Sequence, residues 1–218
     1  EERFIPLPPT TQDARNMKEL ESIKLPILAE LERYAALFDE VLTHEEEFMS
    51  QVLSYVRSRK GKMMRPILVL LLAKELGTIG ESTLRSAVTL ELLHTSSLIH
   101  DDVVDESDER RGRASVHQIY DNKIAVLLGD YMLAQTLEQS ALTESVRVVE
   151  AVARLGATLA EGEIMQLTAV QKKLFQSLLI SPSSLVRPLL SLRLAVRWLR
   201  FLCVPARRCC SNIAVLEN

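Results

Sequence analysis

Three aspartates stand at the end of a strongly apolar segment of this chain. Asp101, Asp102 and Asp105 close the stretch His94-Thr-Ser-Ser-Leu-Ile-His-Asp-Asp-Val-Val-Asp. On a helix, Asp101 and Asp105 are four residues apart and present their carboxylates on one face, where like charges repel unless a cation lies between them. Mg²⁺ suits such a site because it takes oxygen ligands and completes its coordination with water and substrate phosphates. The spacing therefore predicts a magnesium site for a phosphorylated ligand.

The residues before the aspartates predict a buried helix. Between residues 84 and 99 the apolar side chains lie on all sides of the helix instead of forming one stripe. Along it, His94, Ser97, Asp101 and Asp105 follow at spacings of three and four and form a polar line. An unpaired polar group in a core costs about 1–3 kcal/mol, so we expect this line to border a cavity. A solvated loop start is the alternative that the aspartates alone leave open.

Basic residues flank the acidic cluster on both sides in the sequence. Gly61-Lys62-Met-Met-Arg65-Pro66 opens another apolar run, and Arg110-Arg111-Gly112 follows the aspartates. Arg binds phosphate through two parallel hydrogen bonds and Lys binds it as a point charge. Each pattern alone is typical of a solvated surface. Together with the aspartates they indicate a site for two phosphorylated groups.

Further motifs extend this pattern: Glu91-Leu-Leu-His94, Gly129-Asp130-Tyr131 and Glu161-Gly-Glu163-Ile-Met-Gln166-Leu. In order and spacing, from about residue 25 to residue 171, the chain resembles the trans-polyprenyl diphosphate synthases, relatives of farnesyl and geranylgeranyl diphosphate synthase. The resemblance implies an all-α fold, with an isoprenoid-synthase-type helical bundle around a central cavity, and a homodimer. It also implies head-to-tail prenyl transfer, in which isopentenyl diphosphate condenses with an allylic diphosphate to give a polyprenyl diphosphate.

The resemblance assigns two groups of site residues. The allylic diphosphate is held through Mg²⁺ by Asp101, Asp102 and Asp105, with Arg110 assisting. The second group holds isopentenyl diphosphate or faces the reacting centre: Lys62, Arg65, His94, Arg111, Glu163 and Gln166. The implied reaction is ionisation of the allylic C–O bond, attack by the alkene and loss of a proton, promoted by electrostatic preorganisation and positioning.

Ser96 and Ser97 bear on the length of the product. Short-product members of the family carry aromatic rings five and four residues before the first aspartate, where they cap the pocket for the growing tail. Two serines leave that pocket open, so the resemblance implies a long-chain product of the octaprenyl or solanesyl type. Two alternatives stay open: the small residues let helices approach closely, or Tyr131 or Met132 forms a deeper floor.

Composition supports an all-α protein. The 218 residues contain seven glycines and no clear alternation of apolar and polar residues. No apolar stretch reaches the ~18 residues of a membrane span and no signal peptide opens the chain, so we expect a cytoplasmic protein without a nucleic-acid partner. Periodicity and turn residues predict helices near residues 25–40, 44–58, 63–76, 81–105, 115–121, 123–139 and 144–171, the last with a possible break.

Charge divides the chain near residue 171. We expect a flexible leader over 1–22, the N-terminal part of the helical domain over 23–171, and a non-homologous basic tail over 172–218. Up to Gln171 there are 18 basic and 28 acidic residues, whereas the tail has 8 basic residues and one acid. No aspartate follows Asp130, so the second aspartate-rich motif implied by the resemblance is missing and we expect little turnover.

Several alternatives remain at this point. A frameshift best explains the tail, but a basic amphipathic helix on a membrane surface and a non-catalytic partner subunit of a synthase fit it too. The His100-Asp101 pair is also found in metal-dependent phosphohydrolases of the HD type. Such a site needs more than the four histidines present. A terpene cyclase shares the aspartates but needs no second diphosphate site, which leaves Lys62, Arg65 and His94 unexplained.

Overall fold

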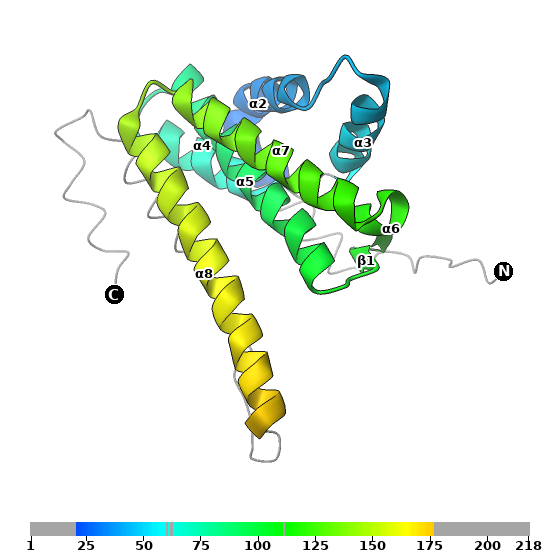
Figure 1. Cartoon of the computed structure of the whole chain (residues 1–218). Helices are drawn as coiled ribbons and strands as arrows, with labels where there is room; N and C mark the ends of the chain where they lie inside the picture. The colour runs from blue at the N-terminus through cyan, green and yellow to red at the C-terminus, as the bar shows by residue number, and fades with distance from the viewer. Residues whose placement is uncertain (1–20, 60, 62, 111, 177–218) are drawn as a thin grey trace.

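Helices make up most of the structure, a computed structural model that describes residues 21–59, 61, 63–110 and 112–176. Figure 1 shows the arrangement. In chain order the elements are the 3-10 helix η1 (Leu25–Ile27), α2 (Leu28–Val41), α3 (Glu47–Ser58), α4 (Met64–Leu76), α5 (Glu81–Val104), β1 (Glu109–Arg110), β2 (Arg113–Ala114), α6 (Val116–Tyr120), α7 (Asn122–Ala141) and α8 (Val146–Gln176). The predicted all-α class is confirmed, and each predicted helix is present with its ends shifted by a few residues.

Helix α5 lies at the centre of the fold. It packs against α2, α4, α6, α7 and α8, and Ala87, Val88 and Leu92 on it are fully buried. Neighbours on several sides explain why its apolar residues do not form a single stripe. The expected burial of the helix that leads to the aspartates is therefore confirmed.

Capping side chains stabilise the first turns of α3 and α7. Glu46 accepts hydrogen bonds from the backbone N–H groups of Phe48 and Met49 at 3.1 and 2.7 Å. These contacts begin α3 at Glu47 instead of at the expected residue 44. They also hold the pKa of Glu46 below its usual value. Asp121 caps α7 in the same way, through the N–H groups of Lys123 and Ile124.

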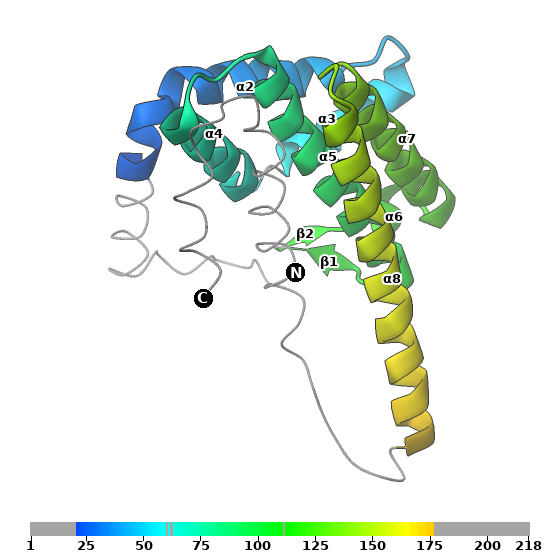
Figure 2. The ribbon, with the colours of Figure 1, turned by 90° about the vertical axis from the view of Figure 1, so that its left-hand side faces the viewer.

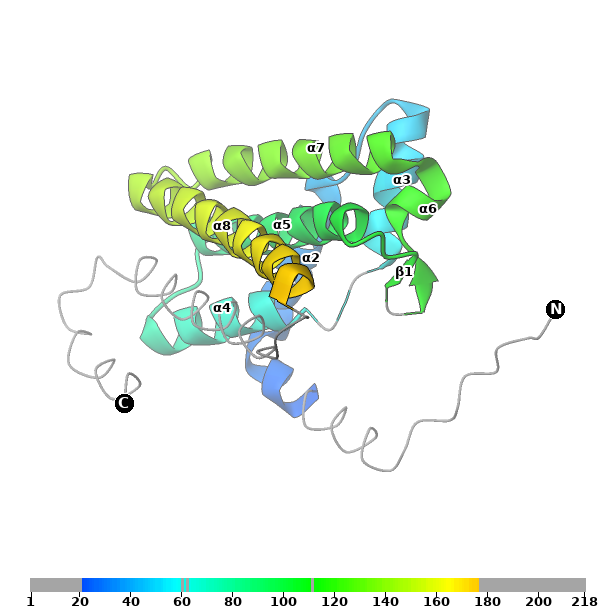
Figure 3. The same cartoon turned by 60° about the horizontal axis from the view of Figure 1, so that its bottom comes forward.

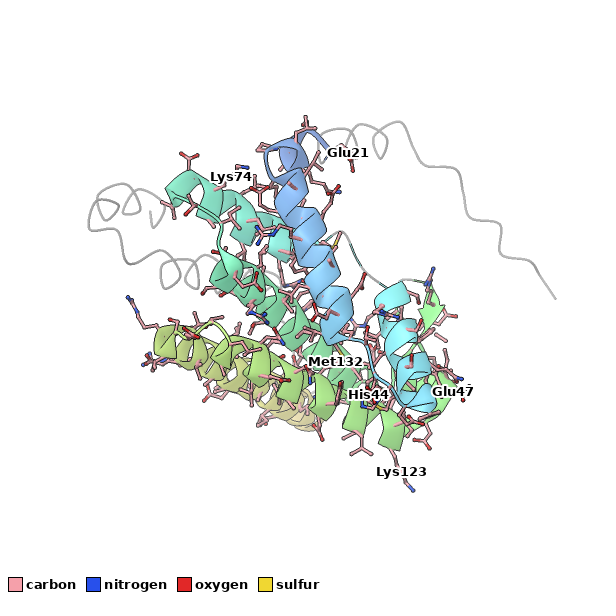
Figure 4. All side chains as sticks on the ribbon, turned by 90° about the horizontal axis from the view of Figure 1, so that it is seen from above. Glu21, His44, Glu47, Lys74, Lys123 and Met132 are labelled. Carbon is pink, nitrogen blue, oxygen red and sulfur yellow. The ribbon has the colours of Figure 1, made fainter. Side chains whose placement is uncertain are left out.

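Helix α2 lies across α4 and α5 when the molecule is seen from above (Figure 4). Lys74 on α4 fixes its start, because the ammonium group donates to Glu30 Oε1 at 2.9 Å and to the Pro26 carbonyl. The hydrogen bond from Lys74 lowers the pKa of Glu30. After α2, the His44 ring meets the edge of Tyr131 on α7, with 6.3 Å between centroids.

Helices α5 and α7 lie side by side (Figure 3). They approach each other closely at Gly129. Ser96 donates from its hydroxyl to the Gly129 carbonyl at 2.8 Å. His100 places Nε2 at 3.2 Å from the Val126 carbonyl oxygen and 3.4 Å from Asp130 Oδ1. A Cβ atom at Gly129 would overlap the His100 ring. Glycine is therefore needed for the helices to meet at this distance.

A short hairpin follows α5. Strands β1 and β2 are antiparallel, with Arg110 opposite Arg113 and Glu109 opposite Ala114. Gly112 has φ +72°, a left-handed conformation that glycine adopts without strain. The sequence predicted the turn at Gly112 but not the strands, because two residues are too few to show alternation.

Helix α8 is buried only near its start. Val148 and Val152 are each 2% exposed, whereas Ile164 and Met165 are 64% and 69% exposed. Figure 2 shows the later half of α8 extending beyond the other helices. The helix continues without the possible break and passes residue 171. The predicted domain boundaries stay predictions, because 1–20 and 177–218 lie outside the described residues. None of the described helices combines the length and hydropathy that a bilayer span requires.

The contact at Gly129 predicts opposite effects for two glycine substitutions. Gly129→Ala is expected to lower the free energy of unfolding by about 1–3 kcal/mol, because the added methyl group displaces His100. Gly156, within α8, has nothing within 4 Å of an added Cβ. Gly156→Ala is expected to raise stability by about 0.5–1 kcal/mol through helix propensity. Urea denaturation followed by circular dichroism measures both, and equal effects would contradict the close approach at Gly129.

Candidate functional site

A cavity of about 750 Å³ opens between α2, the end of α3, the start of α4, α5 and the hairpin. One part of its wall is apolar or aromatic, formed by Tyr34, Phe38, Val56, Leu98, Ile99 and Val116. The other part carries four arginines and a histidine against two carboxylates: Arg59, Arg65, Arg110, Arg113 and His94, with Glu91 and Asp102. The cavity suits a ligand with an anionic head and a hydrocarbon body.

The cationic wall gathers residues from motifs that are far apart in sequence. Arg65 lies in the first turn of α4 and His94 in the middle of α5, and both line the cavity. Met63 precedes α4 with φ 51°, a left-handed conformation that is strained for a residue with a side chain. The strained turn directs the first turn of α4, with its positive helix end, to the cavity.

Asp102 and Arg110 form the ion pair at the base of the hairpin. Arg110 Nε donates to Asp102 Oδ1 at 2.6 Å, and the two side chains are 32% and 3% exposed. Burial of a carboxylate raises the free energy of the folded state unless a nearby cation compensates the charge. Asp102 therefore has an oxygen engaged by Arg110 within the cavity wall.

Asp101 and Asp105 are placed differently from Asp102. Neither lines the cavity, and Asp105 is an exposed residue that ends α5 with its N–H bonded to the Asp101 carbonyl at 2.8 Å. Of the three predicted metal ligands, Asp102 is thus paired with Arg110 in the cavity wall, whereas Asp101 and Asp105 are not among the lining residues.

The described residues contain no cluster of three or more His, Cys, Asp or Glu side chains that could hold a metal ion alone. The chemistry of Asp101 and Asp105 still fits a hard cation, since both supply carboxylate oxygens on successive turns of one helix. Mg²⁺ is commonly bound by one or two carboxylates, with water and substrate phosphates filling the other positions. These two residues therefore fit an ion that is completed by a phosphorylated ligand.

Two aromatic residues of α2 close the apolar side of the cavity. Tyr34 and Phe38 pack with ring centroids 5.9 Å apart. Burial raises the pKa of Tyr34 well above its usual value, and the negative charges of Glu91 and Asp39 raise it further. The phenol therefore stays neutral and contributes wall surface instead of charge.

Sequence reasoning did not identify Arg59, Arg113 and Tyr34 as site residues. Arg59 lies two residues before Gly61 and Arg113 directly follows Gly112, so the signal available was the excess of basic residues around both turns. Tyr34 gave no such signal, because its position depends on how α2 crosses α5.

Four further predicted site residues, all described by the structure, do not line the cavity. Ser96 is buried against α7, and Ser97 donates to the His94 carbonyl of its own helix at 2.9 Å. Glu163 and Gln166 are half-buried on α8. Lys62 and Arg111 fall outside the described residues.

Comparison with known proteins places this arrangement in context. The family model described as polyprenyl synthetase matches residues 46–180. The octaprenyl diphosphate synthase of Haemophilus influenzae is 38% identical over 129 residues, which are 59% of this chain and 39% of that protein. The chain thus spans about two fifths of the length of this curated relative.

Solved structures show the same similarity in three dimensions. A decaprenyl diphosphate synthase from Rhodobacter capsulatus is 35% identical with a TM-score of 0.64, and the match covers 69% of this chain and 46% of that one. A polyprenyl synthase from Caulobacter crescentus, complexed with calcium and isoprenyl diphosphate, is 28% identical with a TM-score of 0.64, covering 68% and 45%. One of these similar proteins thus binds a divalent cation together with a prenyl diphosphate.

Because Asp102 is buried, its ion pair with Arg110 is expected to contribute more to stability than a surface ion pair does. Arg110→Met is expected to lower the free energy of unfolding by about 1–3 kcal/mol, because the buried carboxylate loses its cation. The matched control is Arg154→Met: Arg154 pairs with Glu150 at the same 2.6 Å but is 73% exposed. That change is expected to cost less than about 0.5 kcal/mol.

Chemical denaturation of both variants tests this difference. Adding Asp102→Asn to Arg110→Met is expected to recover part of the loss, because the unpaired charge is removed. Equal costs for Arg110→Met and Arg154→Met would show that Asp102 is solvated.

Proposed function

The chain belongs to the polyprenyl synthetase family, and from this premise we propose that it binds isopentenyl diphosphate and an allylic diphosphate for head-to-tail prenyl transfer. The observation that carries the proposal is the single cavity in which Arg65, His94 and Arg110 face an apolar wall. A prenyl diphosphate has the same two parts, a highly charged head and a hydrocarbon chain.

The cationic wall supports a role in holding and orienting a diphosphate. Arg65 and Arg110 offer planar guanidinium groups that bind phosphate oxygens in pairs, and His94 adds a ring N–H. Within a cavity shielded by Tyr34, Phe38 and Leu98, these groups interact more strongly with the ligand than they would in water. We propose that Arg65 and His94 hold isopentenyl diphosphate and fix its alkene end, that Arg110 assists the allylic diphosphate, and that the cavity walls exclude water from the reacting atoms.

Mg²⁺ is the proposed cation, held by Asp101 and Asp105 with the allylic diphosphate as third partner. When bound, it would supply charge neutralisation of the leaving diphosphate. We assign Asp102 to the same centre through Arg110, which it holds in place. Lys62, Arg111, Glu163 and Gln166 keep the substrate-binding roles that the resemblance implies, as proposals.

An HD-type phosphohydrolase is less well supported. His100 faces α7, where its Nε2 meets the Val126 carbonyl and Asp130. The described part of the chain holds no group of three or more His, Cys, Asp or Glu side chains that could bind the metals of such an enzyme. The arginines of the cavity would also have no role in such an enzyme.

Binding of isopentenyl diphosphate tests the proposal without requiring turnover. Isothermal titration calorimetry is expected to show binding of isopentenyl diphosphate and of inorganic pyrophosphate, but weak or absent binding of isopentenol. Arg65→Met is expected to weaken isopentenyl diphosphate binding by about tenfold or more, the loss typical of a hydrogen bond to a charged group. Arg154→Met serves as the charge-matched control and should leave the affinity unchanged. Equal affinity for isopentenol and isopentenyl diphosphate would contradict a diphosphate site.

We also propose a long-chain product, supported by the small side chains at Ser96 and Ser97. Ser97→Phe is expected to shorten the product, measured by chromatography of dephosphorylated products from labelled isopentenyl diphosphate. A product length equal to that of the parent protein would contradict the placement of the tail pocket beside Ser97.

The homodimer is likewise a proposal, supported by the exposed Leu127, Leu133 and Leu137 along α7. A monomer in sedimentation velocity would contradict it.

A further inference from the structure

The hairpin after α5 is fastened to the C-terminal turn of α3. Tyr55 donates its hydroxyl to the Ala114 carbonyl at 2.5 Å. Arg59 Nη2 donates to the Arg110 carbonyl at 3.3 Å. In the reverse direction, Arg113 Nη1 donates to the Ser58 carbonyl at 3.0 Å. Both strands of the hairpin are thus attached to one helix end, across 51 to 59 residues of sequence.

The hairpin depends on this attachment for its position. Each strand is two residues long, and an isolated two-stranded hairpin is marginally stable at best. Tyr55 also has an aromatic neighbour: its ring lies 6.2 Å from that of Tyr120 at a steep angle, and the Phe48 ring lies 5.9 Å from the Tyr120 ring. The Arg59 guanidinium lies over the Tyr55 ring at 5.4 Å, which adds a cation–π contact.

Arg110 is the cavity residue that this attachment places. Its backbone carbonyl accepts from Arg59, and its side chain donates from Nε to Asp102. A guanidinium has five N–H donors, so the contact at Nε leaves the terminal nitrogens for a ligand in the cavity. The backbone and the side-chain head are therefore each fixed by a separate partner.

We propose that Tyr55, Arg59 and Arg113 form an α3 latch that positions Arg110 for binding of a diphosphate. The choice of diphosphate rests on the proposed function, whereas the positioning of Arg110 follows from the hydrogen bonds alone. Tyr55 is a positioning residue, because it does not line the cavity and reaches a ligand only through the hairpin. The affinity of the cavity for a diphosphate therefore depends on the Tyr55 hydroxyl group, which lies outside the cavity.

Tyr55→Phe tests the latch, because it removes only the hydroxyl that holds Ala114. In the ligand-free full chain, the exchange of the Arg110 Nε–H proton with water, followed by NMR, is expected to be about three- to tenfold faster than in the parent protein. In calorimetry with inorganic pyrophosphate and Mg²⁺, the dissociation constant is expected to rise about three- to tenfold. Tyr120→Phe is the matched control: it removes a hydroxyl from the adjacent ring and should change neither quantity.

A double-mutant cycle separates positioning from general destabilisation. If Tyr55 acts through Arg110, then Tyr55→Phe has no further effect on pyrophosphate affinity in an Arg110→Met background. An equal loss in both backgrounds would overturn the latch, and so would unchanged Arg110 Nε–H exchange in Tyr55→Phe. If the exchange accelerates but the parent protein binds no pyrophosphate, the latch stands and the proposed function fails.

Discussion

A carboxylate that is 3% exposed has lost almost all of its water, and Asp102 is in this position. Its compensating charge comes from Arg110, eight residues later, on the far side of the turn that ends α5. The chain can bring that guanidinium back only by folding the hairpin against the end of α5. The pair therefore constrains the path of the backbone between α5 and α6 and defines one wall of the cavity. A surface ion pair of the same length, such as Arg154–Glu150, places no such constraint on the fold.

The Asp102–Arg110 pair lies at the end of α5, the helix at the centre of the fold. Because neighbouring helices surround α5, polar residues on it have to be satisfied locally or at a cavity. Two serines of α5 are satisfied by hydrogen bonds within the protein: Ser96 donates to the Gly129 carbonyl across the contact with α7, and Ser97 donates to the His94 carbonyl of the preceding turn. His94 and Asp102 are instead placed at the cavity, which both of them line. The same helix thus provides structural hydrogen bonds on one side and cavity-lining polar groups on another.

The amino-acid sequence carried enough information for the helices and for part of the site. Periodicity located α5 within one residue of its observed ends, because a buried helix of that length has a strong apolar signal. The family resemblance assigned Arg65 and His94 to isopentenyl diphosphate and Arg110 to the allylic diphosphate, and all three line one cavity. The sequence did not indicate that Asp102 is buried against Arg110 while Asp105 is exposed, because that ion pair depends on the fold of the hairpin. Arg59 and Tyr55 were missed for the same reason: their partners, Arg110 and Ala114, are more than fifty residues away.

The geometry of α5 also bears on the proposal that this chain binds two diphosphates. His94 and Asp101 are seven residues apart, which is two turns, or about 10 Å along the axis. His94 and Arg65 belong to the cationic wall, whereas Asp101 and Asp105 lie at the C-terminal end of α5 and do not line the cavity. A diphosphate bound directly by guanidinium groups and another bound through a cation at the aspartates would therefore be separated along the helix. Their mutual repulsion is limited by that distance and by the different sign of the protein groups at each position. Asp102 directly follows Asp101 in α5, so the Asp102–Arg110 ion pair lies at the aspartate end of this arrangement, where Arg110 also lines the cavity.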